Sequence, residues 1–235
     1  MEHHSFTWVS AIPGVNLLPG HVATALLVAA LIIFFVLRAK SQRDAASDKD
    51  IPDDSLTFRN LAELLVQGVI GMAEGVLGHQ AMKYVPLYGT FFVFILVSNL
   101  MGLVPGFSPP TTNFNVTFAL GLLSFTAYNF FGFKEQGAGY LKHFVGPMLW
   151  LAPLMIPLEL ISNVVRPFSL ALRLLGNMTG DHTVLEIFTD LTKVIIPVIF
   201  YGLGAFVSFV QAFVFTLLSM VYVSLAVTHH GGEHH

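Results

Sequence analysis

Apolar residues occur along this chain in long blocks separated by short polar segments. The first block covers 21–38, which is long enough to span a bilayer when its ends are included. Basic residues follow it at once, namely Arg38, Lys40 and Arg43. Because Lys and Arg mark the cytoplasmic ends of spans, we predict an external N-terminal tail at 1–20 and a cytoplasmic loop at 39–54.

The segment 55–83 has a different pattern, with apolar residues at helical spacing and polar residues elsewhere on the helical wheel. Its apolar positions are Leu61, Leu64, Leu65, Val69, Met72 and Val76. This pattern favours an amphipathic helix on the cytoplasmic surface of the membrane. A short span is the alternative, although Glu63 and Glu74 interrupt it.

Two further apolar blocks, 86–104 and 116–133, are joined by a segment without Lys or Arg, as an external loop would be. Lys134, Glu135 and Lys142 follow the second block and indicate a return to the cytoplasm. We therefore predict a helical hairpin of two spans over 86–133.

The last two apolar blocks, 144–180 and 194–228, are too long for ordinary spans. As single helices they would measure about 55 Å and 52 Å, against a hydrocarbon core of about 30 Å. Prolines at 153, 157 and 167 would permit kinks in the first block, but no polar turn divides either one. We predict a pair of long, steeply tilted helices over 144–228, followed by a cytoplasmic tail at 229–235.

Composition supports an all-α, polytopic membrane protein that forms a single membrane domain over 1–235. The chain is 54% hydrophobic and only 11% charged, whereas soluble domains average about 25% charged residues. The net charge of −3 and the lack of a basic run argue against a nucleic-acid partner. Cysteine is absent, and no Walker-type phosphate loop is present, so we expect no cofactor, metal site or nucleotide chemistry in this chain.

Arg173 is the candidate functional residue that the pattern singles out, because it lies within the apolar block 144–180. Guanidinium stays protonated in proteins, and an arginine near the middle of a membrane costs about 2.5–3.5 kcal/mol on insertion scales. No acidic residue lies three or four positions away. We therefore expect a partner carboxylate on another helix or another chain.

Polar residues at steps of three or four place a stripe on one face of this predicted helix: Glu159, Ser162, Arg166, Ser169, Arg173 and Asn177. The last predicted helix carries a weaker stripe: Gly204, Ser208, Gln211, Phe215 and Ser219. For the serines, Asn177 and Gln211, simple interhelical hydrogen bonds are the alternative interpretation. Arg166 precedes a proline and is interpreted as structural.

Glu159 and His182 lie on either side of Arg173, about 21 Å and 13 Å away by helical rise. Histidine exchanges protons near neutral pH. We predict a proton relay with one titratable group on each side of the membrane, divided by Arg173, whose charge repels cations. Asp181 adds a second titratable group beside His182. A structural role for Glu159 and His182 is the alternative.

Four strings of the sequence resemble the ion-conducting subunit a of F-type ATP synthases. They are PFSLALRLLGNMTGDH (167–182), FVQAFVFTLLSMVYVSLA (209–226), GFSPPTTNFNVTFAL (106–120) and SNLMGLVPG (98–106). The resemblance implies one N-terminal span, a surface helix, a hairpin and two tilted helices. It also implies c-ring and peripheral-stalk b subunits as partners, and a multi-pass location in a bacterial inner membrane.

The resemblance implies roles for single residues as well. Arg173 matches the essential arginine that faces the c-ring carboxylate, whereas Asn177 and Gln211 match residues of the external half-channel. Glu159 and Ser162 match the cytoplasmic half-channel. Relatives with His at the position of His182 usually carry Glu where this chain has Gly204, so Asp181 and Glu186 are the candidate substitutes.

The sequence thus predicts the ion-translocating stator subunit of a rotary ATP synthase, which is not an enzyme on its own. The ion would be a proton, with sodium left open. The alternative is a self-contained proton-coupled transporter, which would be expected to show an internal repeat and broken helices. An intramembrane hydrolase would need a catalytic motif such as H-E-x-x-H, which is absent.

Overall fold

The computed structural model describes residues 18–45, 57–137, 139–140, 152–191 and 195–227. Within these ranges the chain is helical and contains no strand. The helices are α1 (Gly20–Ala45), α2 (Phe58–Leu77), α3 (Ala81–Met101), α4 (Phe114–Gln136), α6 (Ala152–Leu191) and α7 (Ile195–Val227). Two short 3-10 turns, Gly78–Gln80 and Pro110–Thr112, precede α3 and α4. Five helical segments are long and apolar enough to cross a membrane, which confirms the predicted all-helical, polytopic class.

Local capping explains where α2 and α4 begin and end. The Thr57 hydroxyl accepts a hydrogen bond from the Asn60 N–H, and the Asn113 side chain accepts one from the Asn115 N–H, as helix N-caps do. Both helices end at a glycine with positive φ, Gly78 at 57° and Gly137 at 55°. A residue without a Cβ adopts this conformation without strain.

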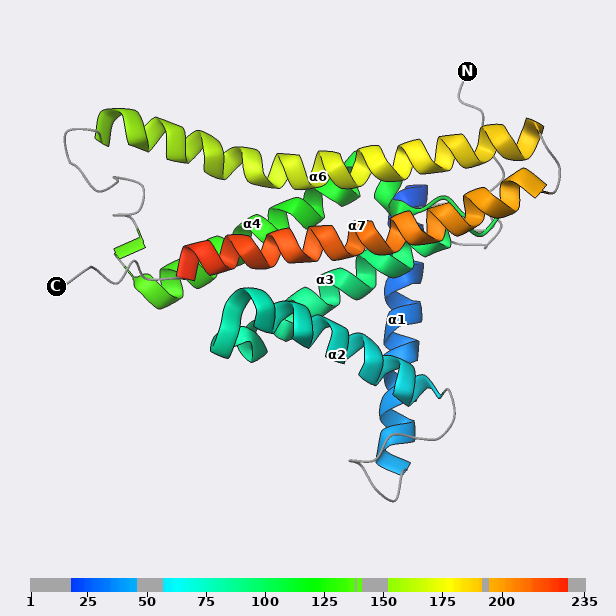
Figure 1. Ribbon diagram of the computed structural model, residues 1–235, viewed down its shortest axis with the longest axis horizontal. Helices are drawn as coiled ribbons and strands as arrows, with labels where there is room; N and C mark the ends of the chain where they lie inside the picture. Colours follow the sequence, from blue (N-terminus) through cyan, green and yellow to red (C-terminus); the bar gives the residue numbers. More distant parts are fainter. Residues whose placement is uncertain (1–17, 46–56, 138, 141–151, 192–194, 228–235) are drawn as a thin grey trace.

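The helices α6 and α7 run side by side along the longest dimension of the molecule, and α1 crosses their direction (Figure 1). At 1.5 Å per residue, the 40 residues of α6 and the 33 residues of α7 extend about 60 Å and 50 Å. Within the described residues, each long apolar block forms part of one continuous helix, and α6 passes through Pro157 and Pro167 without ending. If α1 crosses the bilayer directly, α6 and α7 must be steeply inclined, which supports the predicted tilt.

Two predicted boundaries are wrong. Residues 39–45 belong to α1 and not to a loop, and the remainder of the predicted loop up to 56 lies outside the described residues. The predicted surface helix ends at Leu77, and 81–83 already belongs to α3, so Pro86 lies inside the hairpin's first helix. Near a helix start a proline removes few hydrogen bonds and is tolerated. The predicted tails, apart from 18–20, lie outside the described residues.

The core joins α3, α4, α6 and α7, with buried residues such as Tyr88, Phe91, Phe215 and Leu174. Small residues allow close contacts between these helices. A Cβ added to Gly121 on α4 would lie 2.6 Å from the backbone oxygen of Pro167 on α6. Ser124 on α4 donates a buried hydrogen bond of 2.8 Å to Ser219 on α7. These contacts fix the inner face of α6 against α4 and leave its outer face exposed.

Candidate functional site

Arg173 lies in the middle of α6 on the outer face of the helix. Its side chain is exposed, and so are its neighbours Phe168 and Leu172, whereas Leu170 and Leu174 are buried in the core. None of the described residues forms an ion pair or hydrogen bond with Arg173. The helix therefore presents a permanent cation next to exposed apolar side chains on its outer surface, available to a group from another protein.

One turn after Arg173, the polar stripes of the two long helices meet. Asn177 Nδ2 on α6 donates a hydrogen bond of 2.6 Å to Gln211 Oε1 on α7. Gln211 is buried, with 3% of its surface exposed, whereas Asn177 is open on one side. The structure thus brings together two of the residues that the sequence placed on separate faces.

Three buried polar atoms of α7 have no hydrogen-bond partner among the described residues, namely Ser208 Oγ, Gln211 Nε2 and Thr216 Oγ1. Buried polar groups are normally satisfied by protein atoms or by ordered water. Ser208 and Gln211 belong to the predicted polar stripe of α7, and Gln211 also makes the contact to Asn177, whereas Thr216 lies outside that stripe.

Asp181, His182 and Gly204 form the far end of the site. A Cβ added to Gly204 would lie 2.8 Å from Asp181 Oδ2 and 2.7 Å from Leu103 Cδ2, so the half-buried Asp181 carboxyl occupies the space beside this glycine. His182 Nδ1 lies 3.5 Å from Glu186 Oε1, one turn further along α6. Two acids, Asp181 and Glu186, thus flank the position of His182.

At the other end of α6, Glu159 contacts Arg166, with 3.6 Å between Oε1 and the guanidinium nitrogen. The Arg166 guanidinium also stacks over two rings, Tyr128 on α4 at 5.9 Å and Tyr222 on α7 at 5.3 Å. Arg166 is therefore held between three helices, in line with the structural role predicted for it. Ser162 is exposed nearby.

Sequence reasoning missed Asn163, Tyr128 and Tyr222 in this cluster. The Tyr128 hydroxyl donates to Asn163 Oδ1, and Asn163 is buried. Asn163 directly follows Ser162 of the polar stripe, and this position in the sequence could have marked it as a candidate site residue. The tyrosines lie on helices distant in sequence, and no local pattern points to their contact with α6.

The site therefore consists of three separate parts along α6. Glu159 and Arg173 are 14 positions apart, or about 21 Å by helical rise, and Asp181 lies about 12 Å beyond Arg173. The structure does not bring Glu159 and His182 together. Within the described residues, no group of three His, Asp or Glu side chains could hold a metal ion.

Comparisons with known proteins identify the family of this chain. The family described as ATP synthase A chain matches residues 22–224. ATP synthase subunit a of Bdellovibrio bacteriovorus is 46% identical over 226 residues, which cover 96% of this chain and 99% of the relative. The subunit a of Geotalea uraniireducens is 44% identical, and that of Geobacter sulfurreducens 42%, each over 85% of this chain and 83% of the relative. The chain belongs to the ATP synthase A chain family.

Proposed function

We propose that the chain is the proton-conducting stator subunit in the membrane sector of a rotary ATP synthase. The carrying observation is Arg173, an exposed cation on the outer face of α6 with no ion pair to any described residue. A charge kept in such a place needs a counter-ion to offset its cost in the membrane. A carboxylate on a neighbouring ring of c subunits would supply one.

The polar residues on either side of Arg173 supply the two half-channels in this proposal. On one side are the Asn177–Gln211 hydrogen bond and the unsatisfied atoms of Ser208 and Gln211, where bound water would complete the polar contacts. Asp181 and His182 stand at the outer end of this path. Protons would enter from outside here and neutralise a ring carboxylate.

Glu159 and Ser162 form the second half-channel, which leads to the cytoplasm. Glu159 is partly exposed and oriented by Arg166, so its carboxylate can exchange protons while its position is held. The neutralised ring carboxylate can face lipid at low cost and returns after nearly a full turn to release its proton here. Arg173 separates the two paths because its positive charge repels a proton or cation passing directly between them.

The chain would thus work in a bacterial inner membrane, with its N-terminus outside and its C-terminus in the cytoplasm. It would be held by peripheral-stalk b subunits and carry no nucleotide chemistry of its own. Protons are the proposed ion, and the choice against sodium would depend largely on the ring carboxylate.

Disulfide cross-linking in the intact complex tests whether the outer face of α6 meets the ring. The natural chain has no cysteine, so a single introduced thiol is unique within it. Leu172→Cys places a thiol beside Arg173, and the control Leu26→Cys places one on α1. The two native residues are equally accessible, with Leu172 55% exposed and Leu26 56% exposed. A second cysteine is introduced into the c subunit next to its carboxylate. Leu172→Cys should form a disulfide with this cysteine, and Leu26→Cys should not. Equal cross-linking, or none from Leu172→Cys, would contradict the proposal.

A further inference from the structure

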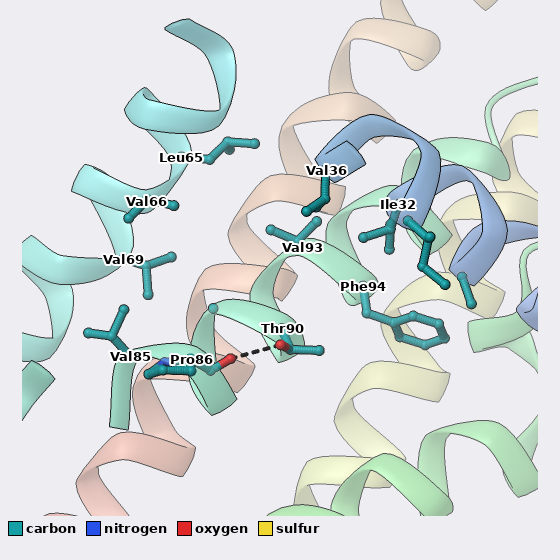
Figure 2. Close-up of a pocket in the computed structure, with 13 residues that line it drawn as sticks. Ile32, Val36, Leu65, Val66, Val69, Val85, Pro86, Thr90, Val93 and Phe94 are labelled. Carbon is teal, nitrogen blue, oxygen red and sulfur yellow. Dashed lines mark hydrogen bonds between the residues drawn. The ribbon is translucent and has the colours of Figure 1, made fainter. Parts of the chain in front are cut away.

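A furrow separates α1 from α2 and α3, on the side of the molecule away from α6. Its apolar part encloses about 390 Å³. Ile33 and Val36 on α1 form one wall, and Val66, Val69, Thr90 and Phe94 on α2 and α3 form the other. Figure 2 shows side chains from three helices around this space, among them Val36, Val69 and Val93.

The described residues that line the apolar part of this furrow offer no unsatisfied side-chain donor to a ligand. Thr90 is the only polar side chain that lines its apolar part, and its hydroxyl donates to the backbone oxygen of Pro86 at 2.7 Å (Figure 2). The walls consist mainly of branched and aromatic side chains, whereas membrane helices that pack closely meet at small residues. The surface is therefore better suited to a flexible hydrocarbon chain than to another helix.

The furrow continues into a second cavity of about 540 Å³ that carries positive charge. Val36 and Val66 line both cavities, and Lys40, Arg43 and Arg59 line the second. On α1, Ile33, Val36, Lys40 and Arg43 follow one another at steps of three or four, which places them along one face of the helix. A single groove thus leads from hydrocarbon to cations.

Among the described residues, not all of these cations have a close ion pair. Arg59 pairs with Glu63 at 2.7 Å. Arg43 has only a loose contact with Asp44, 3.7 Å long and about half exposed, and Lys40 is exposed with no ion pair to any described residue. Two basic side chains at the end of α1 can therefore bind an anion.

We propose that this furrow binds an anionic phospholipid, with an acyl chain along the apolar walls and the phosphate between Lys40 and Arg43. The positive-inside rule places this end of α1 at the cytoplasmic headgroup level, where each basic residue attracts anionic lipid by about 1 kcal/mol, or about fivefold in affinity. The site is separate from the proposed ion path and does not depend on it.

Photolabelling of the intact complex tests this site. The complex is placed in phosphatidylcholine vesicles that contain phosphatidylglycerol with a photoreactive acyl chain, and labelled peptides are identified by mass spectrometry. We expect labels on the α1 and α3 walls, reduced about fivefold or more by the double variant Lys40→Ala with Arg43→Ala. Arg38→Ala is the control, because it removes one positive charge from the same helix end, and neither Arg38 nor Phe34, on which its guanidinium stacks, lines the two cavities of the furrow.

A second variant, Val36→Trp, fills the furrow without changing its charge and should also reduce the wall labels. Phosphatidylcholine with the same photoreactive chain should label the walls weakly and without dependence on Lys40 or Arg43. Equal labelling by both lipids, unaffected by the charge variants, would overturn the proposal in favour of ordinary bilayer contact. Wall labels seen with the isolated chain but not with the intact complex would also overturn it, because a helix of another subunit would then cover the furrow.

Discussion

The carboxyl group of Asp181 on α6 lies directly against Gly204 on α7, so close that a Cβ at position 204 would come within 2.8 Å of Asp181 Oδ2. Gly204→Ala should therefore displace Asp181 and slow proton-driven ATP synthesis, at an overpacking cost of about 1–3 kcal/mol. Gly202→Ala is the matched control, since nothing lies within 4 Å of a Cβ there. The measurement is the synthesis rate of reconstituted complexes.

The same pair can be tested by combining substitutions. In an Asp181→Gly background the carboxyl is gone and the contact with Leu103 remains, so Gly204→Ala should cost less additional activity than it does alone, because residues in contact are not additive. Additive losses would show that Asp181 and Gly204 act independently and would remove this contact from the proposed proton path.

The Asn177–Gln211 hydrogen bond couples α6 to α7 beside Arg173. Asn177→Ala and Gln211→Ala should each destabilise the chain, and the double variant should lose about 0.6–1.7 kcal/mol less than the sum of the two. The measurement is thermal unfolding of the purified chain in detergent. A coupling energy of zero would mean that the two amides do not interact.

Arg166 should prove structural, because it contacts Glu159 and the rings of Tyr128 and Tyr222 at once. Arg166→Ala should reduce the free energy of unfolding by about 1–3 kcal/mol, since it removes two cation–π contacts and an ion pair. Tyr222→Phe keeps the ring beneath the guanidinium and should be nearly neutral. If Tyr222→Phe were as harmful as Arg166→Ala, the ring contact would not explain the loss.

The close approach of α4 and α6 depends on Gly121. A Cβ at this position would lie 2.6 Å from the Pro167 backbone oxygen, which cannot move aside as a flexible side chain can. We expect Gly121→Ala to lower stability by about 1–3 kcal/mol in the same unfolding assay. Gly71→Ala on α2 meets no atom within 4 Å and should be neutral or stabilising, because alanine favours helix. Equal effects of the two would contradict the packing described for α4 and α6.

The sequence predicted the class of the fold and the two polar stripes because hydropathy and helical spacing are local properties. The helix ends were harder to predict. Residues 39–45 are polar and leave the apolar block, but Lys, Gln, Arg and Ala are good helix formers, so α1 continues through them. Pro86 marked a false boundary because a proline close to a helix start costs little.

Contacts between distant helices could not be predicted from one sequence. Periodicity placed Asn177 and Gln211 on the right faces, but the pairing of those faces depends on how α6 and α7 pack over their whole length. The rings that hold Arg166 come from α4 and α7, which no local pattern links to it. The family resemblance had suggested Asp181 as a substitute for an acid at position 204, but the close contact of Asp181 with Gly204 depends on how α6 and α7 pack.

The central claim is that Arg173 is held on the outer face of α6 to meet a carboxylate of the ring. Its most direct test is ion-driven ATP synthesis by the intact complex carrying Arg173→Ala, with assembly checked by co-purification of the other subunits. The account predicts that synthesis is abolished while assembly is largely preserved. Normal coupled synthesis in this variant would contradict it.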